Sequence, residues 1–311
     1  PPATGVIVAG TPAYLVPVGD PAASAGHKTW ASLSVKLSYD GLPSVNIPSN
    51  DKNLIFSSSD ESVATVTAAG EVTANTAGNE GSTIVTVGYA GQNVTNAVTI
   101  RVIKFLELQV KAMAEPEYAG YGAITSISKL ACTSPIKSQQ AKLVVTMVLT
   151  DTSIKTVISS DGKTTYTMSP ENVLERKGQV LTRIVGSTAG SVTVTAGFVG
   201  GVKSNVLPID VRDSEVKMTK IFNVKLAGSL SDGSTMSGAV GTIGRFSFGG
   251  ETDDGRKFNA LTIGSTGIPV FSGMFSFESS LPNVIAIDDS TKGVVQLEGN
   301  GEEAVVGKIL Y

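Results

Sequence analysis

The chain has 311 residues, enough for two or three domains of ordinary size, and it contains 34 glycines, 13 prolines and only 16% charged residues. This composition, rich in Val, Thr, Ser and Ala, predicts an all-β protein of short strands and turns. The net charge of −3, with lysines and arginines scattered along the chain, excludes a nucleic-acid-binding footprint. The single cysteine, Cys132, excludes an intrachain disulfide, and no apolar run is long enough for membrane insertion.

The clearest pattern in the chain is a Ser- and Thr-rich stretch from Ser57 to Val87. It contains a short apolar strand around Val63 and Val66 and then a turn that ends at Gly70. A glycine in this position supplies the positive φ that three- to five-residue hairpin loops need, so we predict a hairpin. Farther on, residues 84–87 alternate apolar and hydroxyl side chains with a period of two, which predicts a strand with one face on a core.

This hairpin pattern recurs with a period of about 110 residues. Val63 corresponds to Val173 and Val284, which follow at intervals of 110 and 111 residues. The residues expected to define the three hairpins are Val63, Val66, Gly70, Val173, Gly178, Val284 and Gly293.

Predicted strands also open each repeat, at residues 4–9, 105–110 and 221–226, and close the first two, at 97–102 and 206–211. About seven short strands in roughly 100 residues is typical of an immunoglobulin-like sandwich. We therefore predict three tandem Ig-like β-sandwich domains over residues 1–103, 104–213 and 214–311. The strands around residue 103 follow each other almost without a linker, which predicts a stiff junction.

The first repeat resembles the bacterial Ig-like domain, group 2 family. The resemblance is carried by Ser57-Ser58-Ser59-Asp60-Glu61-Ser62-Val63-Ala64-Thr65-Val66, by Gly70-Glu71-Val72-Thr73-Ala74 and by Gly81 to Val87. The second and third repeats depart further from the pattern, with Val173-Leu174-Glu175-Arg176 and Val284-Ile285-Ala286-Ile287 at the matching places. The resemblance implies sandwiches found in tandem on adhesins, surface-layer proteins and phage particles, and it implies no catalytic residues.

Compared with the first two repeats, the third ends at Tyr311 about a dozen residues early, so its last strand is missing from the sequence. An uncovered sheet edge promotes aggregation. We expect the natural chain to continue beyond this point; the alternative is a strand donated by a neighbouring subunit. Residues 5–9 could act as that donor, although they fit better as the first strand of the first repeat.

Few residues of the chain have the types and spacing that a catalytic or metal-binding site needs. His27 is the only histidine and lies in a small-residue loop, so we interpret it as an exposed loop side chain rather than part of a triad. Cys132 is interpreted as a small hydrophobic side chain, and zinc is excluded because the chain has one cysteine and one histidine. Asp253 and Asp254 form the best oxygen-ligand cluster, but a solvated turn explains them equally well. Residues 288–293 have only the early spacing of a calcium loop and align with a hairpin turn.

Ligand contact is predicted for the aromatic side chains in loops, namely Tyr118 and Tyr121 in a Gly-rich segment, and Trp30. The alternative for that segment is an ordered interdomain loop. Asn93 starts an Asn-Val-Thr acceptor sequence for N-glycosylation.

The charges alternate along the chain. Residues 1–103 carry a net charge of −3, residues 104–213 carry +3, and residues 214–311 carry −3. Complementary charges of this kind could register neighbouring chains, although differences this small also arise by chance.

Together these features favour a non-enzymatic structural or adhesive segment, without a cofactor, of an extracellular cell-surface or virus-particle assembly. It would act as a spacer, shell or attachment element and would have protein partners through self-assembly or a larger complex. The alternative is a glycan-binding accessory module of a larger extracellular enzyme.

Overall fold

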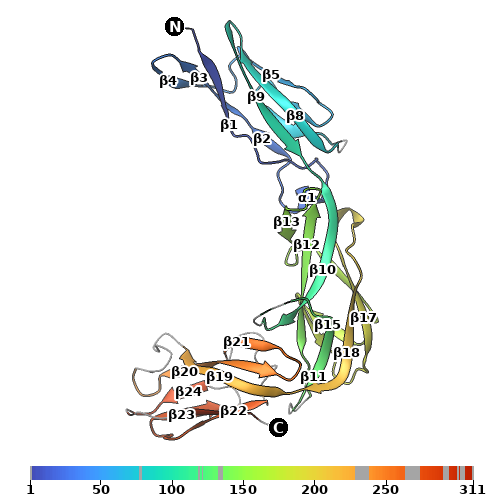
Figure 1. Ribbon diagram of the computed structural model, residues 1–311, viewed down its shortest axis with the longest axis vertical. Helices are drawn as coiled ribbons and strands as arrows, with labels where there is room; N and C mark the ends of the chain where they lie inside the picture. The colour runs from blue at the N-terminus through green and yellow to red at the C-terminus, as the bar shows by residue number, and fades with distance from the viewer. Residues whose placement is uncertain are drawn as a thin grey trace. The chain divides into compact units, whose positions relative to one another are not determined.

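The computed structural model describes residues 2–76, 79–117, 120, 122–131, 136–227, 238–262, 274–289, 294–299, 301 and 305–309. Nearly all regular structure in these residues is β-strand, which confirms the predicted all-β class (Figure 1). Contacts between Cα atoms divide the chain into two compact units. Unit 1 comprises Pro1–Gln109, Val145–Thr165 and Ala196–Asn205, and unit 2 comprises Val110–Val144, Tyr166–Thr195 and Val206–Tyr311. The boundaries near residues 103 and 213 stay a prediction.

Three small sheets form the part of the chain before residue 103, with a short helix, α1 (Pro21–Ser24), between the first two strands. The first sheet has the order β1 (Gly5–Ala9), β3 (Ser34–Tyr39), β4 (Leu42–Ile47); the second has the order β2 (Trp30–Ser32), β7 (Glu71–Ala74), β6 (Ala64–Val66); and the third has the order β5 (Leu54–Ser58), β8 (Gly81–Tyr89), β9 (Gln92–Val102). Strand β1 pairs antiparallel with β3 of the same chain, as its place in the repeat predicts. In β8 the predicted alternation is confirmed, because Thr83, Val85 and Val87 are buried and Ile84 is exposed.

The serine-rich start of the repeated stretch folds around one buried hydroxyl group. The side-chain oxygen of Thr83 accepts the N–H of Asp60 at 2.9 Å and lies 2.8 Å from the Ser58 hydroxyl. Asp60 in turn accepts the N–H of Ser62 at 2.9 Å, and hydrogen bonds from Ser62 lower the pKa of this carboxyl. The polar residues of the motif therefore fix the turn that leads into β6.

Two larger sheets follow, built from residues 105–216. One has the order β10 (Phe105–Glu115), β12 (Gln140–Leu149), β16 (Val180–Arg183), β15 (Leu174–Lys177), with β13 (Lys155–Val157) paired to β12; the other has the order β11 (Ser126–Leu130), β18 (Leu207–Val216), β17 (Gly190–Gly197), β14 (Thr165–Ser169). A short 3-10 turn, η1, spans Val199–Gly201.

The last described strands form two further sheets. One has the order β19 (Met218–Ala227), β20 (Ile243–Thr252), β24 (Val294–Leu297), β23 (Ile285–Asp289), with β21 (Lys257–Thr262) paired to β20; the other joins β22 (Phe275–Ser279) to β25 (Val305–Ile309). Phe246, Phe248 and Phe277 pack together in the core between these sheets.

All three predicted hairpins are present. They are formed by β6 with β7, by β15 with β16 and by β23 with β24. The three aligned valines, Val63, Val173 and Val284, are buried, whereas Val66 is half-buried.

The two described turn glycines of these hairpins differ in their surroundings. Gly70 has a φ of +77°, and a Cβ atom built there would lie 2.8 Å from the ring of Phe56. Gly178 has a φ of +63° and open space around it. A side chain at Gly70 would therefore meet both backbone strain and a clash. Gly293 lies outside the described residues.

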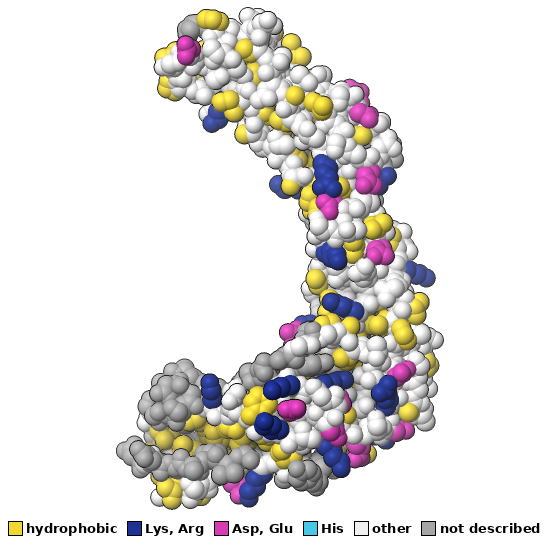
Figure 2. Space-filling view, viewed as in Figure 1, with side chains coloured by type: hydrophobic (Ala, Val, Ile, Leu, Met, Phe, Trp, Pro, Cys, Tyr) yellow, Lys and Arg dark blue, Asp and Glu magenta, His cyan; other side chains and the backbone are white. Residues whose placement is uncertain are grey.

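Charged side chains are scattered over the face drawn in Figure 2, in agreement with their scatter along the sequence. Among the described residues no helix is both long and apolar enough to cross a membrane.

Candidate functional site: the two strand-to-strand junctions

At the first junction, inside unit 1, strand β9 ends at Val102 and β10 begins at Phe105, so Ile103 and Lys104 alone connect them. Ile103 is buried, as are the neighbouring Leu15 and Val102. The connection is therefore part of a packed core rather than an exposed linker.

Each backbone N–H of this connection has a hydrogen-bond acceptor elsewhere in unit 1. The N–H of Ile103 donates to the carbonyl of Leu15 at 3.0 Å, and that of Lys104 donates to the Thr150 hydroxyl at 3.1 Å. The N–H of Phe105 lies 3.2 Å from each carboxylate oxygen of Asp20. The carbonyl of Lys104 accepts the N–H of Thr150 at 2.8 Å. Because these bonds reach both preceding and following parts of the chain, rotation about the connection would break several of them at once.

Asp20 has two roles at this junction. It is the N-cap of α1, where its side chain accepts the N–H of Ala22 at 2.9 Å and Pro21 occupies the first helical position. The same carboxylate holds the start of β10 through Phe105. The Asp-Pro pair thus fixes a one-turn helix and, through it, the entry to the next strand.

Two further polar contacts lie around the same junction. Arg101 forms an ion pair of 2.8 Å with Asp151, and the ammonium group of Lys163 donates to the carbonyl of Ser24 at 2.6 Å. Hydrogen bonds from Ser153 and the guanidinium of Arg101 lower the pKa of Asp151.

His27 is also part of this junction: it lies in a loop, as interpreted, but its side chain is half-buried rather than exposed. Its Nδ1 lies 2.8 Å from the Tyr14 hydroxyl and its Nε2 lies 2.9 Å from the Thr156 hydroxyl of β13. Burial lowers the pKa of His27, and the negative charge of Asp20 partly opposes that shift. The ring connects two segments that are 129 residues apart, a contact that local sequence does not reveal.

At the second junction, inside unit 2, β18 ends at Val216 and β19 begins at Met218, with Lys217 between them. The N–H of Lys217 donates to the carboxylate of Asp253 at 3.0 Å, and the N–H of Asp253 donates to the carbonyl of Lys217 at 2.9 Å. Val216 and Met218 belong to a buried cluster that also contains Leu130 of β11. This junction is therefore continuous with a hydrophobic core.

The two aspartates that were weighed as oxygen ligands do not act together. Asp253 binds the backbone of Lys217, whereas Asp254 accepts from the Gln139 amide at 2.7 Å and pairs with Arg256 at 3.2 Å. Within the described part of the chain, no three His, Cys, Asp or Glu side chains gather as a metal site would require. The sequence did not predict that Asp253 binds the backbone of Lys217. The only local feature that marks this residue is its place in an acidic turn.

Of the three predicted ligand-contact residues, the structure describes Trp30 alone. Trp30 lies on β2 opposite Thr73 and is 54% exposed, while Tyr118 and Tyr121 fall outside the described residues. Asn93 is exposed on β9, so its use as a glycosylation acceptor stays a prediction. Cys132 and residues 290–293 of the weighed calcium loop also lie outside the described residues.

Comparison with known proteins finds a family model that matches one part of the chain. Residues 31–102 match the model of the bacterial Ig-like domain (group 2). No curated protein matches the chain. Solved structures similar to it include S-layer protein SbsC domains 5-6 (18% identity, TM-score 0.25, covering 68% of this chain and 98% of that one) and SbsC domains 4 and 5 (16%, 0.39, 68% and 99%). Another is human protocadherin-24 EC1-2 (14%, 0.22, 58% and 88%). Identities and TM-scores this low say nothing of function. The chain is thus an all-β protein whose residues 31–102 match the model of the bacterial Ig-like domain (group 2).

Proposed function

We propose that this chain is a non-enzymatic structural segment of an extracellular cell-surface assembly, in which it acts as a stiff spacer. The observation that carries the proposal is the first junction, where every N–H from Ile103 to Phe105 is bound by a group outside the connection. A spacer transmits position only if its joints resist bending, and such a connection resists bending without a disulfide or a metal.

Two other observations support a structural role. The family matched by residues 31–102 is a β-sandwich of bacterial proteins. An aspartate also binds a backbone N–H at the second junction: Asp253 accepts from Lys217, as Asp20 accepts from Phe105 at the start of β10. A virus particle would use the same stiffness, and electron micrographs of the native material would distinguish a surface layer from a capsid.

Small-angle X-ray scattering on the whole chain tests the proposal. The wild-type profile is expected to fit one arrangement of the chain. A variant with Gly-Ser-Gly-Ser inserted after Ile103 should need a broad ensemble, because the insertion separates the linker amides from their acceptors. If the wild type and the insertion variant give the same broad ensemble, the stiff spacer is wrong.

A glycan-binding accessory module is the second candidate, and the exposed indole of Trp30 favours it. Aromatic rings on a protein surface are the side chains on which sugar rings stack. A polysaccharide pull-down with the whole chain and with Trp30→Ala decides between the two. If the polysaccharide retains the wild-type chain but not Trp30→Ala, the glycan-binding module is supported. If it retains neither protein, the spacer is supported.

A further inference from the structure

The acidic turn between β20 and β21, residues 253–256, contacts residues that precede the second junction. Asp254 accepts the side-chain amide of Gln139 at 2.7 Å, although the two residues are 115 positions apart. Arg256, at the end of the turn, donates to the carbonyl of Ser126 at 3.4 Å. Ser126 belongs to β11 and Gln139 directly precedes β12, so both contacts connect residues on opposite sides of the junction. All of these residues lie in unit 2.

The carboxylate of Asp254 is the centre of these contacts. Besides the Gln139 amide, it accepts the hydroxyl of Thr252 at 2.6 Å and pairs with the guanidinium of Arg256 at 3.2 Å. Gln139, Thr252 and Arg256 are buried. Hydrogen bonds to a charged acceptor are stronger than those between neutral groups, and their loss would leave buried polar groups unsatisfied. One carboxylate therefore holds the turn together and attaches it to Gln139.

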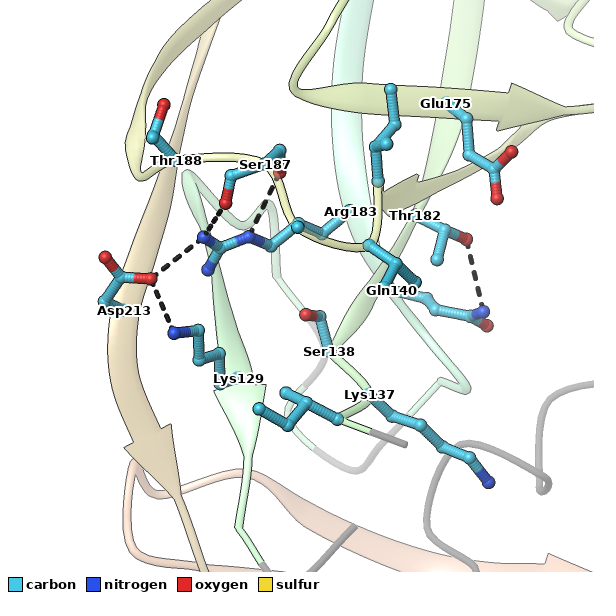
Figure 3. Close-up of a pocket in the computed structure, with 14 residues that line it drawn as sticks. Lys129, Lys137, Ser138, Gln140, Glu175, Thr182, Arg183, Ser187, Thr188 and Asp213 are labelled. Atoms are coloured by element: carbon cyan, nitrogen blue, oxygen red, sulfur yellow. Dashed lines mark hydrogen bonds and ion pairs between the residues drawn. The ribbon is translucent and has the colours of Figure 1, made fainter. Parts of the chain in front are cut away.

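The residue to which Asp254 attaches is itself fixed to the preceding sheet. The side-chain oxygen of Gln139 accepts the N–H of Ser128 in β11 at 3.1 Å, and the N–H of Gln139 donates to the carbonyl of Ser128 at 2.9 Å. Strand β11 is in turn held on β18, because Lys129 pairs with Asp213 at 2.8 Å. Figure 3 shows Asp213 between Lys129 and Arg183, which it binds at 2.9 Å. The attachment point is therefore part of the sheet that contains β18.

Two kinds of contact hold the strands on either side of Lys217 together. The buried cluster that contains Leu130 and Met218 attracts them, but apolar contact has no preferred direction. Hydrogen bonds do have one, because they weaken steeply when donor and acceptor are misaligned. Rotation about the backbone of Lys217 would move the turn away from Gln139 and break the bond to Asp254.

We propose that the turn of residues 253–256 is a latch that fixes the orientation of β19 and β20 relative to β11 and β18. Asp254 closes this latch by binding Gln139, and Arg256 adds a second contact through Ser126. The latch would supply stiffness at the second junction, so its part in the function rests on the proposed spacer.

Distances between two spin labels on the full chain, measured by double electron–electron resonance, test the latch. The labels are attached through Ser191→Cys on β17 and Ile243→Cys on β20, in a Cys132→Ser background. Both label positions are exposed, and they lie on opposite sides of the second junction within unit 2. The labelled chain with the latch intact should give one narrow distance distribution. Asp254→Ala should lose it and give a wide one.

Gln139→Met is the second variant, and it removes the amide while preserving the length of the side chain. The bonds of Asp254 to Thr252 and Arg256 stay in place, so the turn should remain folded while the distance distribution widens. Glu171→Ala is the control, because Glu171 is an exposed acidic residue of unit 2 outside the latch; its distribution should stay narrow. Cooperative urea unfolding would verify that each variant is folded.

A wide distribution with the latch intact, or a narrow one in either folded latch variant, would overturn the latch. These results are separable from those for the spacer, because the labels report on the second junction alone. A chain that is flexible in scattering but narrow in this distance would refute the spacer and leave the latch. A chain that is stiff in scattering but keeps its narrow distance in Asp254→Ala would refute the latch alone.

Discussion

At the first junction the connection between β9 and β10 contains a buried residue, Ile103, and its amides bind acceptors from distant parts of the chain, whereas at the second the connecting Lys217 is exposed between two buried residues. Asp20 and Asp253 both accept a backbone N–H at their junction, Asp20 from Phe105 at the start of β10 and Asp253 from the connecting Lys217. Both junctions adjoin buried apolar side chains, but the polar side chains of His27 and Tyr14 also lie around the first. We infer that the stability of the first junction is sensitive to polar changes as well as to packing, and that of the second mainly to changes in packing.

The largest effect is expected from Leu130→Ala, which removes a buried side chain next to the second junction. Truncation of a buried leucine costs about 2–5 kcal/mol, because apolar burial is lost and a cavity is left. This loss of unfolding free energy would be measured by urea denaturation, followed by a signal that reports on residues 206–262. Leu106→Ala, at an exposed leucine of β10, is the matched control and should cost less than about 0.5 kcal/mol. Equal, small losses in both variants would contradict the role of the cluster.

A smaller loss is expected from Asp20→Ala at the first junction. The substitution removes the N-cap of α1 and leaves the N–H of Phe105 without its acceptor, at a cost of about 1–2 kcal/mol. Chemical denaturation and scattering should show both lower stability and a broader ensemble. Asp20→Asn keeps an acceptor oxygen, so its stability should lie between that of the wild type and that of the alanine variant. If Asp20→Ala were as stable and as rigid as the wild type, Asp20 would not hold the junction.

Asp253→Ala should cost about 1 kcal/mol, since it removes one hydrogen bond to Lys217 while Val216 and Met218 stay packed. Scattering should show no broader ensemble for this variant, in contrast to Asp20→Ala. If Asp253→Ala loosened the chain as much as Asp20→Ala does, the contrast between the two junctions would be lost.

A pH-dependent effect is expected at the first junction alone. Burial lowers the pKa of His27 below its ordinary value of 6.5, so folding favours the neutral ring. The contribution of the neutral His27 ring to the free energy of unfolding is therefore complete above pH 6.5. It is lost as the pH falls from 6.5 through the lower pKa that His27 has in the folded state. Denaturation midpoints measured from pH 7.5 to 5 should fall for the wild type and change less for His27→Gln. Parallel curves for the two proteins would exclude His27 as the cause.

The smallest effect is expected from Arg101→Gln. The ion pair with Asp151 is partly exposed, with side-chain accessibilities of 48% and 21%, and pairs of this kind contribute roughly 0.2–1 kcal/mol. The loss should shrink further at high salt. A loss well above this range would mean that Arg101 does more than pair with Asp151.

The hairpins could be predicted from the sequence because their signals are local. Val63, Val173 and Val284 recur at a constant interval, and the alternation in residues 84–87 directly reflects the two faces of a strand. Strand limits were less predictable: β10 runs to Glu115, beyond the predicted end at residue 110.

The junction contacts could not be predicted, although the short connection itself was visible. Asp20 and Phe105 are 85 residues apart, and Lys217 and Asp253 are 36 apart, so no local pattern links either pair. For the same reason the hydrogen bonds of His27 were missed, and although Asp253 does lie in an exposed turn as interpreted, its bond to Lys217 was missed too. The sequence contained these residues but not the fold that brings their partners to them.

The central claim is that the connections are held by hydrogen bonds from their own amides. Hydrogen–deuterium exchange, measured by NMR on the full chain, follows the N–H groups of Ile103, Lys104, Phe105 and Lys217 directly. Protection comparable to that of the paired amides within β9 and β18 is predicted for all four. Exchange of these amides within seconds at neutral pH, while the strands on both sides stay protected, would contradict the account.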